Sequence, residues 1–189
     1  QTKNNQKMAL KGTNQEFGRP YNRRIVLETI RQHGPVARAD IAGRVGLTVQ
    51  TVSNIFRELE DQGYIAGARE APKSRGYPAT SLSINPEGGY AIGIDITPLG
   101  LEAALINLAG EVVAREQRKL THPAPEAAFR EIFALVKEFR SIKHGQRMLG
   151  IGFAMPGPFD VESMSFVGPT TLEGWKGVDV QRRLAEGAN

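Results

Sequence analysis

The sequence contains no cysteine, so the chain can form neither disulfides nor thiolate metal sites, and it has no cysteine nucleophile. It also lacks long hydrophobic runs: no apolar stretch approaches the roughly 20 residues that a transmembrane helix needs. The first twelve residues, QTKNNQKMALKG, are polar and basic and do not resemble a secretory signal. These absences favour a cytoplasmic protein with no membrane partner.

Charge is distributed unevenly along the 189 residues, of which 40% are hydrophobic. Residues 1–78 hold 13 Lys and Arg against 7 Asp and Glu, whereas residues 79–189 hold 11 against 13. A chain of this length forms one large or two small domains, and this imbalance indicates a basic N-terminal domain followed by a slightly acidic one. A basic surface suits contact with phosphates, although it can also be merely solvated.

Residues 37–64, ARADIAGRVGLTVQTVSNIFRELEDQGY, predict two short helices joined by a tight turn. In the second helix, Val52, Ile55, Phe56 and Leu59 fall at the spacing of one buried helical stripe. Thr48 stands at the position of an N-cap, and Gly46 and Gly63 stand where the chain must turn sharply. The pattern is typical of a helix-turn-helix, and the alternative is an ordinary helical hairpin with a solvated polar face.

The polar face of the second helix predicts a DNA-reading surface, because a recognition helix directs its N-terminal residues toward base edges. Two cations of the following segment extend the prediction. The set of predicted DNA-binding residues is Thr48, Gln50, Thr51, Ser53, Asn54, Arg57, Lys73 and Arg75.

The segments around this motif complete a winged helix-turn-helix domain, which we assign to residues 21–85. A first helix is predicted over residues 21–33, ending at Gly34-Pro35, and residues 1–20 form a flexible basic arm. Strand patterns begin at residue 64 and span residues 80–84, with a basic, proline- and glycine-rich segment between them. A hairpin in this position is a wing, whose Lys73 and Arg75 either approach DNA or belong to an ordinary basic loop.

A second domain follows the turn-forming segment 85–89, and we assign residues 86–189 to it. Strands are predicted over residues 90–96, 101–107 and 112–118, with a hairpin turn at 107–111. An amphipathic helix over 126–139, a strand over 148–154 of fully buried character, and a short helix near 178–186 complete the pattern. The fold class is therefore mixed α/β: a winged helix-turn-helix followed by part of an actin-like or hexokinase-type (ribonuclease H-like) lobe.

Four segments, in this order and spacing, resemble the ROK (repressor, open reading frame, kinase) family of transcriptional regulators. They are residues 12–65, RGYPATSLSINPEGGYAIGIDIT, GIGFAMPGPFD and LEGWKGVDVQRRLAE. The resemblance implies a winged helix joined to a sugar-kinase-like domain, and a repressor of carbohydrate-metabolism genes whose operator affinity responds to a sugar or sugar phosphate. One recognition helix reads only a few base pairs, so we further expect a homo-oligomer on a palindromic double-stranded operator. The alternative within the family is a sugar kinase with a DNA-binding appendage.

The sequence departs from the family pattern in ways that argue against catalysis. The family's glycine-rich phosphate loop is replaced after Asp95 by Ile96-Thr97-Pro98-Leu99, and Pro98 has no N–H for a phosphate. Asp95 then has a second interpretation, as a hydrogen-bonded residue at the end of a strand. The wing tip reads Gly76-Tyr77-Pro78, where the family usually has Gly-Arg-Pro.

The family's catalytic aspartate, sugar-contacting Asn-Asp motif and zinc site correspond to positions beyond Asn189, so we expect no enzyme activity and no cofactor in this chain. The loop Pro156-Gly157-Pro158 corresponds to one that borders the family's sugar pocket, and it is either a candidate effector site or a rigid turn. A lobe present only in part should leave apolar strand surface uncovered.

Overall fold

The computed structural model describes residues 18–69, 80–120, 123–160, 165–166 and 172–187 of the chain. These residues divide into two compact units at the boundary between Gly88 and Gly89, and each unit is described by itself. No helix among the described residues is long and apolar enough to cross a lipid bilayer.

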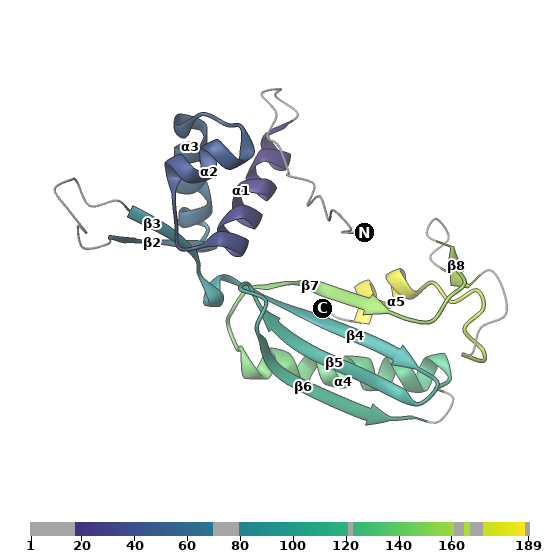
Figure 1. Cartoon of the computed structure of the whole chain (residues 1–189). Coiled ribbons are helices and arrows are strands. Elements are labelled where there is room, and N and C mark those ends of the chain that lie inside the picture. Colours follow the sequence, from purple (N-terminus) through teal and green to yellow (C-terminus); the bar gives the residue numbers. More distant parts are fainter. Residues whose placement is uncertain (1–17, 70–79, 121–122, 161–164, 167–171, 188–189) are drawn as a thin grey trace, which may run out of the picture. The chain divides into compact units, whose positions relative to one another are not determined.

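Three helices and a small sheet make up the first unit (Figure 1). The helices are α1 (Arg19–His33), α2 (Arg38–Val45) and α3 (Val49–Asp61). The antiparallel sheet has the order β1-β3-β2, formed by β1 (Val36–Ala37), β2 (Ile65–Arg69) and β3 (Thr80–Ile84). The predicted three-helix arrangement and β2–β3 hairpin are confirmed, and β1 adds a third strand that the sequence did not reveal.

Helix α1 begins two residues earlier than predicted, so Arg19 and Pro20 belong to the helix and not to the N-terminal arm. Proline in the first turn explains this start, because its fixed φ suits a helix and its missing N–H is not needed there. The helix ends where predicted: the N–H of Gly34 donates to the Ile30 carbonyl at 2.7 Å. A Cβ at Gly34 would lie 2.6 Å from the same oxygen, so this close approach requires glycine.

The core of the first unit draws on every one of its helices and on its sheet. Each helix buries one stripe, and Val36, Ile65 and Leu82 close the core from the strands. The end of α3 is tied to the sheet by Asn85, whose Nδ2 donates to the Gly63 carbonyl at 2.8 Å. Gly63 itself has a φ of 75°, the left-handed conformation predicted for it. The hydrophobic core is thus enclosed from all sides.

The second unit is built on a four-stranded sheet of order β6-β5-β4-β7. Its strands are β4 (Tyr90–Thr97), β5 (Gly100–Asn107), β6 (Val112–Lys119) and β7 (Met148–Ala154). The first three strands form an antiparallel meander, and β7 joins β4 in parallel. Helix α4 (Pro125–Ile142) provides the crossover to β7 and covers one face of the sheet (Figure 1). The remaining described elements are the short pair β8 (Phe159–Asp160) and β9 (Ser165–Phe166), and helix α5 (Val180–Gly187).

Strand alternation explains the core between this sheet and α4. On β4, Tyr90, Ile92, Ile94 and Ile96 are buried toward the helix, whose own buried residues include Phe129, Ile132 and Phe139. Trp175 completes this core: its Nε1 donates to the Pro123 carbonyl at 2.8 Å, and its ring lies 5.5 Å from that of Phe129. Trp175 is therefore a packing residue, fully buried in the core of the second unit.

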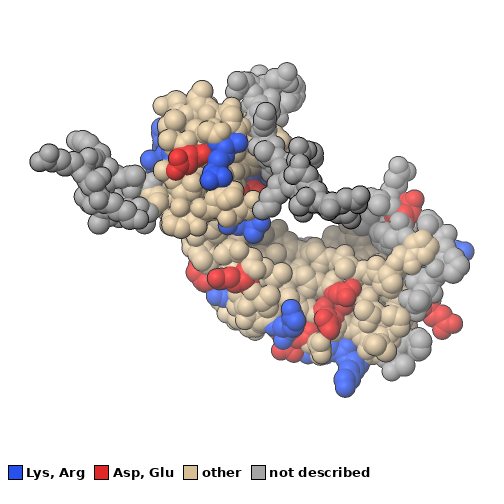
Figure 2. Space-filling view, in the orientation of Figure 1, with Lys and Arg blue, Asp and Glu red and all other residues tan. Residues whose placement is uncertain are grey.

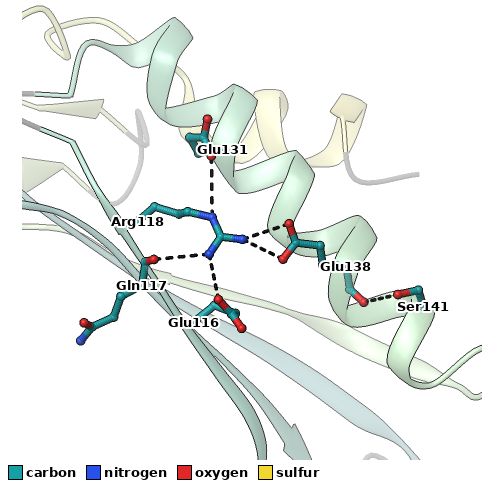
Figure 3. Close-up of polar contacts among 6 residues, drawn as sticks. All are labelled: Glu116, Gln117, Arg118, Glu131, Glu138 and Ser141. Carbon is teal, nitrogen blue, oxygen red and sulfur yellow. Dashed lines mark hydrogen bonds and ion pairs between the residues drawn. The ribbon is translucent and has the colours of Figure 1, made fainter.

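Charged side chains hold α4 against the edge of this sheet (Figure 3). The guanidinium of Arg118 on β6 donates to both carboxylate oxygens of Glu138, at 2.9 and 2.7 Å, and to Glu116 at 2.8 Å. Glu131 lies 3.9 Å from its Nε. The hydrogen bonds that Glu116 and Glu138 accept from Arg118 raise the pKa of its guanidinium, which therefore stays charged. The cluster joins the outer strand β6 to two carboxylates that lie about two turns apart on α4.

The opposite face of the sheet is uncovered among the described residues. Gly93 on β4 pairs with Ala104 on β5 and with Gly152 on β7, which gives a strip of small residues across three strands. A Cβ added at Gly93 or Gly150 would meet no atom within 4 Å. The prediction that β7 is fully buried is wrong, because its alternate residues Gly150, Gly152 and Ala154 are exposed on this face. Leu149 is also 44% exposed.

Candidate DNA-binding interface

Helix α3 begins with the predicted cap. The hydroxyl oxygen of Thr48 accepts a hydrogen bond from the backbone N–H of Thr51 at 3.1 Å, and the two hydroxyl groups lie 2.9 Å apart. Gly46 lies two residues before Thr48, between α2 and α3, and turns the chain there with a φ of 70°. This geometry fixes where α3 begins, and it leaves the positive end of the helix dipole at the residues that were predicted to read DNA.

The exposed side of α3 carries a connected polar array. Gln50 Nε2 donates to Asn54 Oδ1 at 3.1 Å, and Arg57 Nη2 donates to the same oxygen at 3.3 Å. All three residues are exposed, while Val52, Ile55, Phe56 and Leu59 on the other side of the helix are at most 4% exposed. One side of α3 is therefore apolar and packs on the core, and the other side carries a polar array that can contact a ligand.

Charge is also polarised along α3. The first turn contains no acidic residue, whereas Glu58, Glu60 and Asp61 lie in the second half. Arg19 forms an ion pair with Glu58, and Arg23 donates to Gln62, so α1 neutralises part of this acidic end. An approaching polyanion therefore meets repulsion at the end of the helix and attraction at its start.

Net charge alone does not mark a site. In the view of Figure 2, charged side chains of the described residues lie in small separate groups, with acidic and basic groups close together. On α1, for example, Arg31 forms an ion pair with Glu28 at 2.7 Å, and its hydrogen bond lowers the pKa of that carboxyl. The candidate interface is thus defined by the hydrogen-bonding face of α3.

The remaining predicted residues lie around this array or outside the described residues. Thr51 and Ser53 are half-buried along the sides of α3. The wing strands are present, but Lys73 and Arg75 lie outside the described residues.

Two residues near the array were missed by the sequence analysis. Val49, the first residue of α3, is 50% exposed, and an apolar side chain in this position suits the methyl group of thymine. Its place directly after the N-cap was the available signal. Arg38 lies with its guanidinium 4.2 Å above the ring of Phe56, a contact that no sequence pattern indicated.

The loop Pro156-Gly157-Pro158 lies in the second unit, after the end of β7. Pro156 is half-buried, whereas Gly157 and Pro158 are exposed. A shallow hollow of about 470 Å³ lies on the uncovered face of the sheet, lined among others by Gly93, Asp95 and Gly152. Neither proline contributes to this lining.

Asp95 does not behave as the hydrogen-bonded residue of our second interpretation. Its side chain is exposed, and it makes no hydrogen bond with the residues that the structure describes. The cause is its position on the open face of β4, where the paired residues are Glu102 and Ala154. Among the described residues, no group of three or more histidine, aspartate or glutamate side chains could hold a metal ion.

Comparison with known proteins supports the two-part architecture. Residues 19–66 match the family of winged helix-turn-helix DNA-binding domains. The chain is 24% identical over 177 residues to the xylose repressor of Bacillus subtilis, covering 93% of this chain and 46% of the repressor. It is 29% identical over 165 residues to the xylose repressor of Caldicellulosiruptor bescii, covering 85% and 41%. The Escherichia coli regulator NagC is 24% identical over 168 residues, covering 86% and 41%.

A solved structure extends the likeness to the fold. The crystal structure of a ROK family transcriptional regulator, a homologue of the E. coli MLC protein, superposes with a TM-score of 0.68 at 22% identity. The match covers 89% of this chain and 43% of that one, and the chain likewise spans less than half the length of the curated relatives. The chain therefore contains a winged helix-turn-helix DNA-binding domain. It is similar over most of its length to curated transcriptional regulators, and its fold is that of a ROK family transcriptional regulator.

Proposed function

We propose that the chain is the DNA-reading part, and the beginning of the sensor domain, of a sequence-specific transcriptional repressor of carbohydrate-metabolism genes. The observation that carries the proposal is the exposed array of Gln50, Asn54 and Arg57 on a capped, well-packed α3. The names of the relatives, two xylose repressors and NagC, support the same function.

The array has the chemistry of base recognition. Arginine donates two hydrogen bonds to guanine O6 and N7, and asparagine or glutamine pairs with adenine N6 and N7. The contacts among Gln50, Asn54 and Arg57 hold these side chains on one face before DNA arrives. Less side-chain freedom is then lost on binding, which favours affinity.

The start of the second unit suits a sensor better than a kinase. In the turn between β4 and β5, the Leu99 N–H donates to the Thr97 hydroxyl at 3.2 Å, and Pro98 has no N–H. The Leu99 side chain is 83% exposed at the place where a phosphate loop needs bare backbone. Residue 98 thus offers no N–H to a phosphate, and the N–H of Leu99 is already bonded to Thr97. Both features support a binding function without phosphoryl transfer.

A sugar or sugar phosphate is the proposed effector of the whole regulator, and Pro156-Gly157-Pro158 is the proposed border of its site. This loop follows β7, which runs parallel to β4, and ligands of open α/β sheets bind beyond the carboxyl ends of such strands. The operator is proposed to be palindromic and bound by a homo-oligomer, since a single recognition helix reads only a few base pairs.

Selection of bound DNA tests the proposal. The 189-residue chain is incubated with duplexes that carry a random segment of about 20 base pairs, and bound molecules are amplified and sequenced over several rounds. We expect one motif to be enriched and to bind at least tenfold more tightly than a shuffled duplex. The matched control is Asn54→Asp, which keeps the side-chain size but loses the amide donors and should enrich no motif. Equal enrichment by both proteins, or none by the unchanged chain, would contradict the proposal.

A further inference from the structure

Arg38 differs from three other arginines of the first unit, whose guanidinium groups have polar side-chain partners. Arg19 pairs with Glu58, Arg23 donates to Gln62, and Arg31 pairs with Glu28. Arg38 instead lies over the Phe56 ring, and its Nε is buried with no hydrogen-bond partner. Among the described residues, no carboxylate forms an ion pair with it. An arginine held in place while its donors remain unused is unusual, because a buried donor without an acceptor costs free energy.

The contact with Phe56 attaches Arg38 to one side of the recognition helix. Phe56 follows Ser53 by three residues and Val49 by seven, so the three side chains lie along the same side of α3. Val49 and Ser53 are at least partly exposed there, while Phe56 is buried with 4% of its surface accessible. Arg38 thus borders the part of α3 that is proposed to enter the major groove.

A cation in this position faces the wall of the groove. When a recognition helix lies in the major groove, the sugar–phosphate strands run along its sides, and the preceding helix crosses one of them. Arg38 is the first residue of that preceding helix, α2. The cation–π contact with Phe56 holds the guanidinium in place, and its two Nη groups carry four N–H donors suited to phosphate oxygens.

The acidic residues nearby do not occupy these donors. Asp40 lies two residues along α2, and Glu60 lies one turn beyond Phe56 on α3, but neither pairs with Arg38 in the described structure. The opposite side of α3 also carries cations, from α1, yet two of them are already bound to Glu58 and Gln62. Arg38 therefore retains its capacity for a new acceptor beside α3.

We propose that Arg38 is a DNA-phosphate contact, preset by Phe56, that positions α3 in the major groove. The proposal rests on the function proposed above and adds a residue to the interface. A phosphate contact carries no sequence information, so its loss should weaken binding to all duplexes equally. It should also lower the salt dependence of binding by the equivalent of about one released counterion.

The test uses the full 189-residue chain and two labelled duplexes, one enriched by selection and one shuffled. Anisotropy titrations between roughly 50 and 200 mM KCl give the affinity and its slope against salt. We expect Arg38→Met to weaken binding to both duplexes by about five- to tenfold and to reduce the slope by about one. Arg38→Lys, which keeps the charge, should recover most of the slope. Arg31→Met removes the same charge from α1 and should leave both affinities within about twofold.

The outcomes separate the possible roles of Arg38. Unchanged affinity and slope in Arg38→Met would show that Arg38 only packs against Phe56, and a loss confined to the selected duplex would show base reading; either result overturns the proposal. Thermal melting of each variant establishes that it is folded, and Arg38→Gln replaces Arg38→Met if the latter is not. If the unchanged chain binds neither duplex, the proposed function itself fails. If the unchanged chain binds DNA and Arg38→Met binds it with the same affinity and salt slope, only the inference about Arg38 fails.

Discussion

The two units of the chain bury their apolar residues in different ways. In the first unit, three helices and a small sheet enclose one core, so the described polar groups that remain on α3 are available for a ligand. In the second unit, α4 covers only one face of the sheet, and the other face presents Gly93, Ala104 and Gly152 without a covering element among the described residues. The described core residues of the first unit are thus buried, whereas the second unit has a face suited to close packing against another surface.

This comparison also refines an expectation from the sequence. We expected apolar strand surface to be left uncovered, but the uncovered strip consists mostly of glycine and alanine. Charged residues lie at the rim of this strip. Glu102 on β5 stands opposite Asp95 on β4 in the strand register, and Arg115 on β6 stands opposite Ala104 on β5. Among the described residues, larger exposed apolar side chains of this sheet include Leu149 and Val113, which lie on the outer strands β7 and β6. Small residues allow another backbone to approach closely, so this face differs from an ordinary exposed patch of large apolar side chains.

The largest expected effect contrasts the enclosed core with an edge strand. Leu59→Ala removes a fully buried side chain of α3 and should lower the free energy of unfolding of the first unit by about 2–5 kcal/mol. Leu149→Ala on β7 should change that of the second unit by less than about 0.5 kcal/mol. Circular dichroism follows both units, while fluorescence of the single tryptophan, Trp175, reports the second. A shifted fluorescence transition in Leu59→Ala would contradict the separation into two units.

A smaller effect tests the uncovered face directly. Gly93→Ala should leave the second unit unchanged or stabilise it by up to about 1 kcal/mol, because the new methyl group meets open space and the unfolded chain loses freedom. Gly34→Ala should instead destabilise the first unit, since its Cβ would lie 2.6 Å from the Ile30 carbonyl oxygen. Urea denaturation of both variants measures the difference. Clear destabilisation by Gly93→Ala would mean that the face is already packed in solution.

The third prediction concerns the attachment of α4 to the sheet. Arg118→Met removes the hydrogen bonds to Glu116 and Glu138 and should cost the second unit about 1 kcal/mol, because the cluster is networked but partly exposed. The matched control is Arg130→Met on the exposed side of α4, which should cost less than about 0.5 kcal/mol. Equal effects of the two variants in tryptophan-monitored unfolding would show that the cluster contributes nothing beyond a surface charge.

The smallest effect links α4 to α5 and depends on pH. Two hydrogen bonds from Arg183, together with its charge, lower the pKa of the Glu126 carboxyl. The folded-state pKa lies below the unfolded one, so the contribution to stability is full above the ordinary glutamate pKa and is lost as pH falls through the lowered value. Arg183→Met should return the pKa of Glu126 to its ordinary range in a carbon-detected NMR titration. An unchanged titration midpoint would show that the ion pair does not persist in solution.

Most of the fold follows from local sequence patterns. The N-cap at Thr48, the turns at Gly46 and Gly63, and the strands over residues 80–84 and 148–154 were all predicted where they occur, since each depends on neighbouring residues. What failed depends on distant parts of the chain. Strand β1 has two residues and exists through pairing with Leu82 and Ser81. The exposure of β7 depends on which sheet face α4 covers, which its apolar composition does not encode.

The candidate site divides in the same way. Gln50, Asn54 and Arg57 could be found from helical spacing, because the buried stripe of α3 determines which residues face outward. Arg38 could not, since its contact with Phe56 joins residues of two helices and leaves no periodic trace. Val49 was passed over because an apolar residue at a helix start is usually taken as core.

The central claim is that the exposed face of α3 reads DNA sequence while the core side only holds the helix. Its most direct test is the affinity ratio between a selected duplex and its shuffled counterpart, measured by anisotropy for the unchanged chain and for the double variant Asn54→Ala/Arg57→Ala. Each lost contact removes about 1–3 kcal/mol of discrimination, so the ratio should collapse to about one while the melting temperature stays unchanged. A double variant that is folded and keeps the full ratio would contradict the account.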